Sequence, residues 1–478
     1  MKCNVIAWMI KAICLVITIV ASASARIINV PAEYSTIQTG IDASVSGDTV
    51  LVATGEYWED INPNEKNILL TSSNGPDSTI IQGYIRLTGA LDSTFEFRGF
   101  KVIGQATEPM HGWPIIQCIG TGARKITGNI LTGNIGCGID VYQCGAVIRH
   151  NIIENNWNPG GGGGIYFTPD SNSEISYNVI RNNRSGFFFY NIGNGAGIIC
   201  TRGRIFYNLI YGNEVRSAAD SNSEYGTGGG ITAKTGGSGR IYIYNNTIVN
   251  NAASRPPWGG GGGGIYAERE GQTLDTILIE NNIIAYNNIG GVTAPFSLIT
   301  GYNLFYGNIP YDLLAPDTSE SNIFGLDPLF ADTSNDDYNL LAGSPCIDAG
   351  NPNYPLDPDS TIVDIGAIFF DRRVSIDDED GFISPHNFFL SQNYPNPFNS
   401  ETIISFYLAE VQVVNLRIFD ITGRVVKRLI TDEQLEPGEH RVIWDGRDNS
   451  GEGVVTAIYF AELEVEGSKF VKSMILIR

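Results

Sequence analysis

NTIVNN, residues 246–251, is one of seven copies of the pattern Asn-x-(Ile/Leu/Phe)-x-x-Asn in the middle of this chain. The copies begin at residues 129, 151, 178, 208, 246, 282 and 303. Six copies are followed by Gly-Ile or Gly-Val, at Gly138, Gly164, Gly197, Gly230, Gly264 and Gly291. Between the two signals the residues alternate or form short apolar runs, with no long helical period. The pattern therefore predicts a repeated unit of short β-strands.

A unit of this size cannot bury its own apolar face, but it can do so against stacked copies of itself. The sequence thus predicts a parallel β-helix with one repeat per coil and about 4.8 Å between neighbouring coils. Asparagines at one repeat position would then stack in the turns, and their amides would hydrogen-bond along the column. We interpret these asparagines as structural ladder residues and not as ligands.

Glycine runs precede two of the Gly-Ile pairs, at residues 160–164 and 259–264. The distance from the first Asn of a copy to its Gly-Ile pair is nine residues in the first and sixth copies and larger in the four between. The longer copies carry insertions at one turn, over residues 157–163, 184–196, 214–229 and 252–263. Glycine tolerates backbone angles that other residues avoid, so we interpret the runs as hinges where each loop re-enters a strand.

The strand after each Gly-Ile pair is expected to alternate between core and solvent. The predicted inward positions are all apolar or small: Val141, Phe167, Cys200, Ala233, Ala267 and Ala294. The predicted outward positions include Asp140, Tyr142, Tyr166, Lys234, Tyr266 and Glu268. The inserted loops rise along one edge of this outward strip and bring further aromatic and basic residues to it.

Exposed aromatic rings with arginine nearby suit the apolar C–H faces of sugars, and loops on a rigid scaffold are a common place for binding. The candidate carbohydrate-binding residues are Tyr142, Trp157, Tyr166, Arg184, Arg216, Trp258 and Tyr266.

The chain has 478 residues, enough for two or three domains. Residues 1–25 have the pattern of a signal peptide, with Lys2 and Lys11, an apolar run at 12–21 and Ala23-Ser24-Ala25 as the cleavage site. We expect an exported mature chain without a membrane span. A net charge of −21 argues against nucleic acid and anionic membranes as partners. Five cysteines remain, an odd number without zinc spacing, and their disulfide pairing stays open: Cys118, Cys137, Cys144, Cys200 and Cys346.

The N-terminal stretch VPAEYSTIQTGIDASVSGDTVLVATGEY, residues 30–57, carries a short helical period at Ile37, Ile41 and Val45 behind Ser35 and Thr36. Such a helix could cap the end of a solenoid. The stretch resembles the N-terminal pattern of right-handed parallel β-helix proteins of the pectin-lyase-like class, except that Thr54 stands where proline is usual. Residues 327–352 and 364–370 resemble the closing segment of such helices. The resemblance covers roughly residues 28–370 and implies the fold of a β-helix domain at 26–370, but the class includes lyases, hydrolases, epimerases and adhesins.

Residues 371–389 form an acidic linker, and residues 390–478 contain six or seven short alternating segments that predict a β-sandwich. This part resembles the C-terminal sorting domain of type IX secretion cargo, through Asn-Tyr-Pro-Asn-Pro-Phe-Asn at 393–399, Gly423-Arg424 and Trp444-Asp445-Gly446. The family's Ser-Gly is Thr456-Ala457 here. The resemblance implies the type IX secretion machinery as a partner and a secreted or bacterial cell-surface location.

Catalytic signals are few. The coils lack the paired aspartates and Gly-His-Gly of polygalacturonan hydrolases on this fold. A lyase needs a base, for which Lys234 is the candidate, with Glu268 in the same register one coil on. We prefer to interpret these two as an ion pair between coils. Asp348, Asp357, Asp359 and Asp364 could hold Ca²⁺, although acidic turn residues are the simpler interpretation.

The sequence therefore predicts an all-β, secreted cell-surface protein: a right-handed parallel β-helix with a helical cap, then a small β-sandwich. Its expected partner is extracellular polysaccharide, bound along the loop-bearing face without catalysis. Two alternatives stay open, namely a polysaccharide lyase acting on a uronate-containing glycan and a structural or adhesive surface protein.

Overall fold

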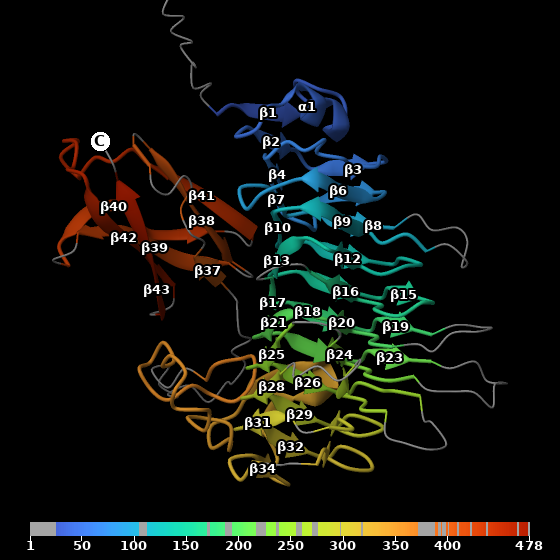
Figure 1. Ribbon diagram of the computed structural model, residues 1–478. Helices are drawn as coiled ribbons and strands as arrows, with labels where there is room; N and C mark the ends of the chain where they lie inside the picture. The colour runs from blue at the N-terminus through green and yellow to red at the C-terminus, as the bar shows by residue number, and fades with distance from the viewer. Residues whose placement is uncertain are drawn as a thin grey trace, which may run out of the picture.

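The protein is a solenoid of parallel strands followed by a small antiparallel domain (Figure 1). The computed structural model describes residues 25–104, 112–169, 173–186, 194–216, 226–235, 239–254, 261–269, 276–296, 298–316, 319–370, 388–390, 393, 398–399, 401–408, 411–420, 423–435, 438–465 and 468–476. The predicted signal peptide and almost all of the predicted linker lie outside these residues.

Two walls of the solenoid are 11-stranded parallel sheets. Sheet A consists of β1 (Ile27–Val30), β2 (Thr49–Val52), β4 (Leu69–Ser72), β7 (Glu96–Arg98), β10 (Ala123–Thr127), β13 (Gly145–Arg149), β17 (Glu174–Ser176), β21 (Gly203–Phe206), β25 (Ile241–Tyr244), β28 (Ile277–Glu280) and β31 (Ile299–Gly301). Sheet B consists of β3 (Gly55–Tyr57), β5 (Thr79–Gln82), β8 (Lys101–Ile103), β11 (Ile130–Thr132), β14 (Ile152–Glu154), β18 (Val179–Arg181), β22 (Leu209–Tyr211), β26 (Thr247–Val249), β29 (Ile283–Ala285), β32 (Leu304–Tyr306) and β34 (Ile323–Phe324).

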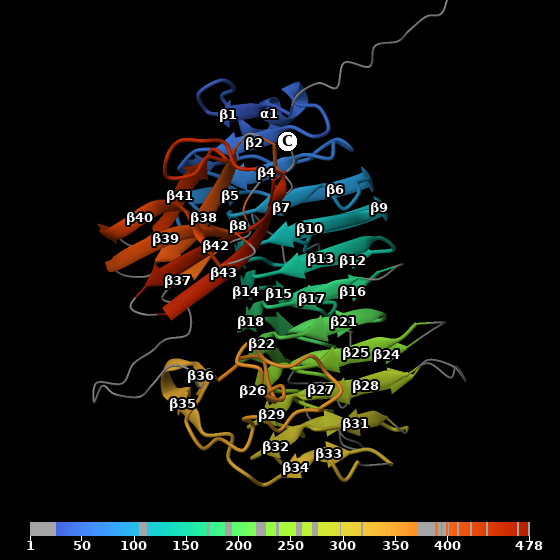
Figure 2. The ribbon, with the colours of Figure 1, turned by 90° about the vertical axis from the view of Figure 1, so that its left-hand side faces the viewer.

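The third wall, sheet C, has nine parallel strands, and a short strip beside it has three. Sheet C consists of β6 (Ile85–Ala90), β9 (Ile116–Thr121), β12 (Ile139–Tyr142), β16 (Ile165–Thr168), β20 (Ile198–Cys200), β24 (Ile231–Thr235), β27 (Ile265–Arg269), β30 (Val292–Thr293) and β33 (Leu313–Leu314). Strip D consists of β15 (Trp157–Asn158), β19 (Arg184–Ser185) and β23 (Glu214–Val215). A typical coil visits sheet C, sheet A and sheet B in that order (Figure 2), and three middle coils continue into strip D.

The core of the solenoid is a continuous stack of inward side chains. The predicted inward column of sheet C is confirmed, because Val141, Phe167, Cys200, Ala233, Ala267 and Ala294 are all buried. Strand pairing places Val141 beside Phe167, and Cys200 beside Ala233. Like side chains thus stack on like, and each coil covers the apolar face of its neighbour.

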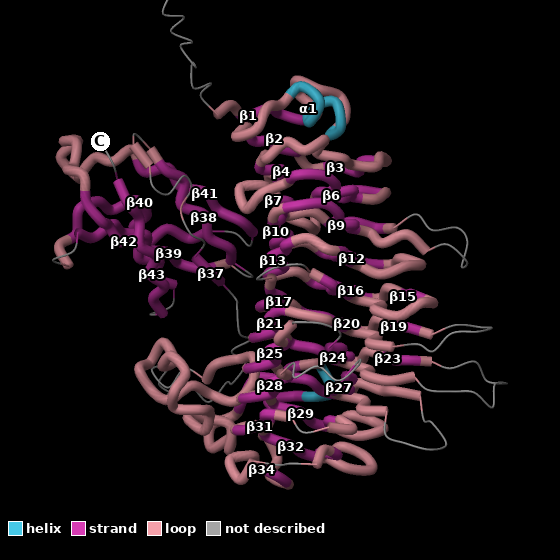
Figure 3. The backbone as a smooth tube through the Cα atoms, in the orientation of Figure 1, coloured by secondary structure: helices cyan, strands magenta, loops and turns pink. Residues whose placement is uncertain are grey.

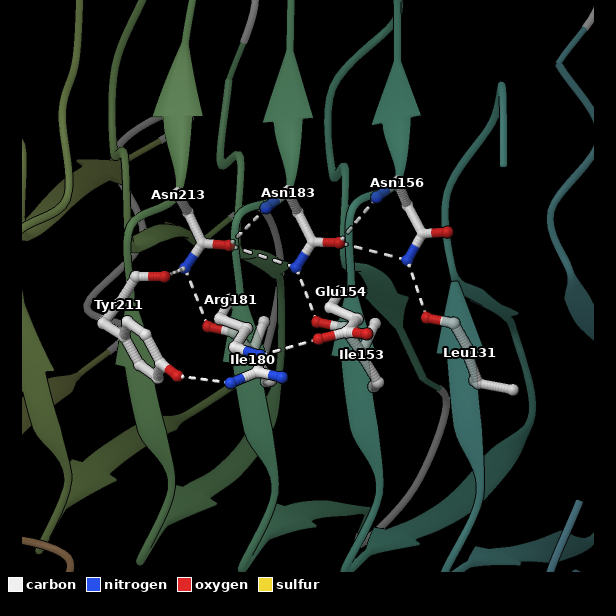
Figure 4. A network of polar contacts seen from close by, with 9 residues as sticks. All are labelled: Leu131, Ile153, Glu154, Asn156, Ile180, Arg181, Asn183, Tyr211 and Asn213. Carbon is white, nitrogen blue, oxygen red and sulfur yellow. Dashed lines mark hydrogen bonds and ion pairs between the residues drawn. The ribbon is translucent and has the colours of Figure 1, made fainter. Parts of the chain in front are cut away.

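Two asparagine ladders run along the solenoid where the sequence pattern predicted stacking. The first joins Asn129, Asn151, Asn178, Asn208, Asn246, Asn282, Asn303 and Asn322, each amide donating to the next side-chain oxygen at 2.9–3.0 Å. The second ladder contains the last Asn of each copy, and Figure 4 shows Asn156, Asn183 and Asn213 of it. Each of these amides also donates to a backbone carbonyl of the preceding coil, such as Leu131 and Ile153. The ladders therefore satisfy most buried amide groups of two corners, with the Oδ1 atom of Asn134 at the end of the second ladder as an exception.

The residue before each first-ladder Asn from Asn129 to Asn303 has a positive φ, as at His150 (55°), Tyr177 (55°) and Tyr207 (52°). The three rings stack along the axis with centroids 5.1–5.2 Å apart. Because the left-handed conformation turns the chain sharply, these residues make the corner between sheets A and B.

The interpretation of the glycine runs as hinges explains some of these glycines but not the glycine of each Gly-Ile pair. Gly162, Gly195, Gly228 and Gly262 do have positive φ angles, between 50° and 66°. The glycine of each Gly-Ile pair does not, and it is required for another reason. A Cβ on Gly164 would lie 2.5 Å from the carbonyl oxygen of Gly197, and the same close approach recurs at Gly197, Gly230, Gly264 and Gly291. This column is glycine because neighbouring backbones pass too closely for any side chain.

The α-helix α1 (Ile37–Ala43) packs on β1 and β2 at the N-terminal end of the stack (Figure 3). Thr36 is its N-cap and forms a reciprocal capping box with Thr39. Ile37 and Ile41 are fully buried, as their spacing predicted, but the prediction was wrong for Val45, which is 51% exposed because the helix ends before it at the C-cap Ser44. The role of α1 as a terminal cap stays a prediction.

Residues 327–370, which we call the strap, fold back along the outer face of sheet B. The strap contains β35 (Phe330–Asp332), the 3-10 turn η1 (Thr333–Asn335) and β36 (Asp337–Leu340). Its apolar residues form a second core with outward residues of sheet B: Phe330, Tyr338, Leu340, Cys346 and Ile365 with Tyr211, Val249, Ile283, Ala285 and Leu304. The strap therefore covers a flank of the C-terminal coils.

The C-terminal domain is a β-sandwich of two antiparallel sheets, as predicted. One sheet has β37 (Phe388–Leu390), β38 (Thr402–Leu408) and β41 (Gly438–Trp444), and the other has β40 (Val425–Leu435), β39 (Gln412–Asp420), β42 (Ala457–Val465) and β43 (Ser468–Leu476). Trp444 is fully buried, contacts Phe398 and Tyr459, and donates to the carbonyl of Arg447 at 2.9 Å. The sandwich has its own core, separate from that of the solenoid.

Candidate functional site

The candidate binding face consists of the outer surface of sheet C and the adjoining strip D. One outward column of sheet C contains, in register, Arg86, Gln117, Asp140, Tyr166, Ile199, Thr232, Tyr266 and Thr293. A second column contains Tyr142 beside Thr168, and Lys234 beside Glu268. The sheet C candidates therefore lie on one face of the sheet, as the alternation in the sequence predicted.

The aromatic residues of sheet C do not form one continuous stripe. Tyr166 and Tyr266 share a column, but Ile199 and Thr232 lie between them. Tyr142 lies in the second column and is 48% exposed. Burial raises the pKa of the Tyr266 hydroxyl, so this ring is partly embedded in the face. The structure therefore separates the predicted tyrosines into two groups.

Strip D brings Trp157, Arg184 and Glu214 into register on three successive coils. Trp157 and Arg184 were expected in inserted loops, but each begins a two-residue parallel strand before its loop departs. The ladder Asn at 156, 183 or 213 immediately precedes each strand, and its fixed corner continues the strand pairing for two more residues. These side chains consequently have the positional rigidity of the solenoid.

Arg184 and Arg216 flank the carboxylate of Glu214. The guanidinium of Arg216 lies 2.8 Å from it and that of Arg184 lies 3.8 Å from it, while their side chains are 56% and 54% exposed. The Trp157 ring is half-buried, and its Nε1 donates to the carbonyl of Gly186 at 3.2 Å. The sequence pattern did not identify Glu214, whose position is fixed by its register with Arg184 and with Ala252 on the two neighbouring coils. The face of strip D therefore presents the partly exposed Trp157 ring, and beside it two arginines that contact the same Glu214 carboxylate.

Lys234 and Glu268 form an ion pair across adjacent coils, with 3.1 Å between Nζ and Oε2. This geometry fits the structural interpretation of the two residues.

Trp258, the remaining candidate, lies outside the described residues, as do Phe187 to Tyr190, Tyr225 and Arg255 of the inserted loops. The candidate face is therefore defined by sheet C and strip D alone.

The four aspartates considered for Ca²⁺ are in the strap. Asp364 accepts hydrogen bonds from the backbone N–H groups of Asp348 and Phe370, and Asp357 accepts one from that of Asp364. Burial raises the pKa of Asp357 to about 7 and also raises that of Asp364. In the described part of the chain, no group of three His, Cys, Asp or Glu residues is arranged to hold a metal ion. The hydrogen bonds of Asp357 and Asp364 to backbone N–H groups are those of carboxylates that fix turns.

A further cluster on the face was missed by the sequence analysis. Arg86 of β6 lies under the rings of Tyr84 and Trp113, and Gln117 and Asp140 follow it along the outward column. Trp113 is 54% exposed. The N-terminal coils lack the Asn repeat, so no periodic signal showed that residues 86 and 113 would meet.

The comparisons with known proteins agree with the fold. The sequence matches the family model for the right-handed β-helix region over residues 112–309 and the model for the FlgD Ig-like domain over residues 392–468. The comparison with curated proteins finds no match. The chain is thus a right-handed parallel β-helix with a C-terminal β-sandwich.

Similar solved structures include pectate lyase Pel9A, with 13% identity, a TM-score of 0.41 and coverage of 73% of this chain and 97% of that one. The alginate lyase AlyGC of family PL6 has 16% identity, a TM-score of 0.33 and coverage of 63% and 50%. PorZ, a surface component of the type IX secretion system of Porphyromonas gingivalis, has 20% identity and a TM-score of 0.15 over 19% of this chain. The chain spans only 11% of the length of PorZ and 10% of that of latent PorU from the same organism. Among the described residues, no helix is long and apolar enough to cross a membrane.

Proposed function

We propose that this protein binds extracellular polysaccharide along sheet C and strip D. The observation that carries the proposal is the alignment of Trp157, Arg184 and Glu214 on three successive coils, with Arg216 beside Glu214 on the third. An aromatic ring offers a surface for the C–H face of a sugar, while the arginines and the carboxylate offer donors and acceptors to its hydroxyls. Successive coils are about 4.8 Å apart, so the set presents an aromatic ring and charged groups at regular intervals along one line, which suits a polymer.

The ladders support this proposal because they fix the spacing of the candidate residues before any ligand arrives. Asn156, Asn183 and Asn213 each directly precede a strip D strand and are bonded to one another or to neighbouring carbonyls (Figure 4). Beside them, Arg181 bridges Glu154 and the hydroxyl of Tyr211 at 2.7 and 2.8 Å. A site that is already ordered loses less conformational entropy on binding.

Replacing Trp157 with Ala should weaken binding of the recognised glycan about ten-fold, which corresponds to about 1.4 kcal/mol, in line with a lost aromatic contact. A glycan array with the full mature chain identifies the ligand, and titration of the variant measures the loss. Trp58→Ala is the matched control, because Trp58 is a 68% exposed tryptophan in the first coil. Equal binding by both variants would contradict the proposal.

The same assays separate the other functional classes. Turnover of a uronate polymer into an unsaturated product would select a lyase, whereas binding without turnover supports the proposed function. If the array shows neither binding nor turnover, the protein is better explained as a structural or adhesive surface component.

We also propose that the sandwich carries the chain through the type IX secretion machinery to the cell surface. The support is the sequence resemblance at 393–399, 423–424 and 444–446 together with a sandwich that has a core of its own. The polysaccharide-binding solenoid would then face the environment of the cell.

Deletion of residues 390–478 should leave the truncated chain in the periplasm, with the solenoid still folded, since the two cores are separate. Cell fractionation and surface proteolysis measure the location, and circular dichroism of the purified truncated chain checks the fold. Surface delivery of the truncated chain at the normal level would exclude a sorting role.

A further inference from the structure

At the N-terminal end of the candidate face, an exposed tryptophan lies on an arginine. The guanidinium carbon of Arg86 is 4.7 Å from the ring centroid of Trp113 and 5.2 Å from that of Tyr84. Burial lowers the pKa of Arg86, and its Nη1 atom is buried. The two rings therefore cover the guanidinium group. The Trp113 ring, which is 54% exposed, is the part of the cluster that solvent reaches.

Two polar side chains follow Arg86 along the same outward column of sheet C. Gln117 is in register with Arg86, Asp140 is in register with Gln117, and the Gln117 amide is hydrogen-bonded to the Asp140 carboxyl. Asp140 forms no ion pair with a lysine or arginine within the described ranges. Burial raises the pKa of this carboxyl to about 6. A half-buried, unneutralised carboxyl on the outer face of a sheet is costly, and packing alone does not explain it.

The chemistry of the three side chains is that of a sugar site. An exposed indole stacks on the C–H face of a pyranose, while an amide and a carboxyl on adjacent strands can hydrogen-bond to its hydroxyls. The charge pattern excludes an acidic sugar as the preferred ligand, because the available charge is the Asp140 carboxylate and the Arg86 cation is covered by rings. Strip D differs in this respect, since Arg184 and Arg216 are more than half exposed.

We propose that Trp113, Gln117 and Asp140 form a second subsite of the face, which takes one neutral pyranose unit, and that Arg86 and Tyr84 hold the Trp113 ring in position. This inference rests on the proposed polysaccharide binding. Trp113 lies two coils before Trp157, so the bound polymer would lie along the axis of the solenoid from strip D toward Trp113.

The test uses the full mature chain with cellohexaose, xylohexaose and mannohexaose as neutral probes and hexagalacturonate as the acidic probe. Calorimetric titration should show that Trp113→Ala and Asp140→Ala each weaken binding of the preferred neutral probe at least ten-fold. Trp113→Phe, which keeps an aromatic ring, should stay within about three-fold of the unmodified protein. Thermal unfolding of each variant reports whether the fold is kept, and Asp140→Ala provides the test if Trp113→Ala is unstable.

The outcomes separate the subsite from the function on which it rests. If Trp157→Ala lowers binding but Trp113→Ala and Asp140→Ala bind as the unmodified chain does, polysaccharide binding stands and the second subsite is wrong. Binding of hexagalacturonate alone would equally overturn the neutral subsite. If the unmodified chain binds no glycan on the array or in titration, the proposed function itself fails.

Discussion

Replacing Asn246 with Leu is expected to lower the melting temperature of the protein by about 4–7 °C, the shift that a loss of about 3–5 kcal/mol gives in a solenoid of this length. The Asn246 amide donates to the carbonyls of Ile205 and Tyr244 and to the side-chain oxygen of Asn282. Its own oxygen accepts from the backbone and side-chain N–H groups of Asn208. Leucine would leave several of these groups buried and unpaired, at about 1–3 kcal/mol each.

The control for this prediction is Asn353→Leu, which makes the same chemical change at an exposed position in the strap. Thermal unfolding followed by circular dichroism should show a shift for Asn246→Leu only. An unchanged melting temperature for Asn246→Leu would mean that the ladder contributes nothing to the stability of the folded chain.

The second large effect is expected from Gly164→Ala. The added Cβ would lie 2.5 Å from the carbonyl oxygen of Gly197, 3.0 Å from Cγ2 of Ile180 and 3.1 Å from Nδ2 of Asn183. The clash with backbone can be relieved only by separating two coils, and overpacking of this kind costs about 1–3 kcal/mol. Because the φ of Gly164 is not positive, backbone strain would not be the cause.

Gly160→Ala makes the same change four residues earlier in the same glycine run. Its Cβ would meet only Asn158 Oδ1, at 3.6 Å. We expect the stability of this variant to be unchanged or slightly higher, since alanine restricts the unfolded chain more than glycine. Chemical denaturation of both variants makes the comparison. Equal stability would show that coil spacing adapts to a side chain at position 164.

The sequence was sufficient to predict the solenoid because the Asn pattern repeats in seven coils and one hydrogen-bonding role explains it. It was also sufficient for the register of Lys234 and Glu268, since both follow a Gly-Ile pair by the same number of residues. The second ladder was contained in the same pattern, as its final Asn. Periodicity identifies a position whenever every coil repeats it.

Other parts of the face could not be predicted in this way. Strip D strands have two residues each, too few for an alternation to be recognised, so Trp157 and Arg184 were assigned to loops. Arg86 and Trp113 come from coils without the Asn pattern, and their contact depends on coil lengths that the sequence does not mark. At the glycine of each Gly-Ile pair, the backbones of neighbouring coils approach each other closely. This separation between coils cannot be derived from the amino-acid composition.

The strap has a consequence for how the protein is made. It is synthesised after the coils that it covers, so the flank of Leu209, Ile283 and Leu304 stays bare until residues 327–370 are available. A chain that is truncated or cleaved before the strap would expose this apolar surface to other molecules and would tend to aggregate. Only a chain that has been synthesised through the strap can therefore cover this apolar surface of sheet B.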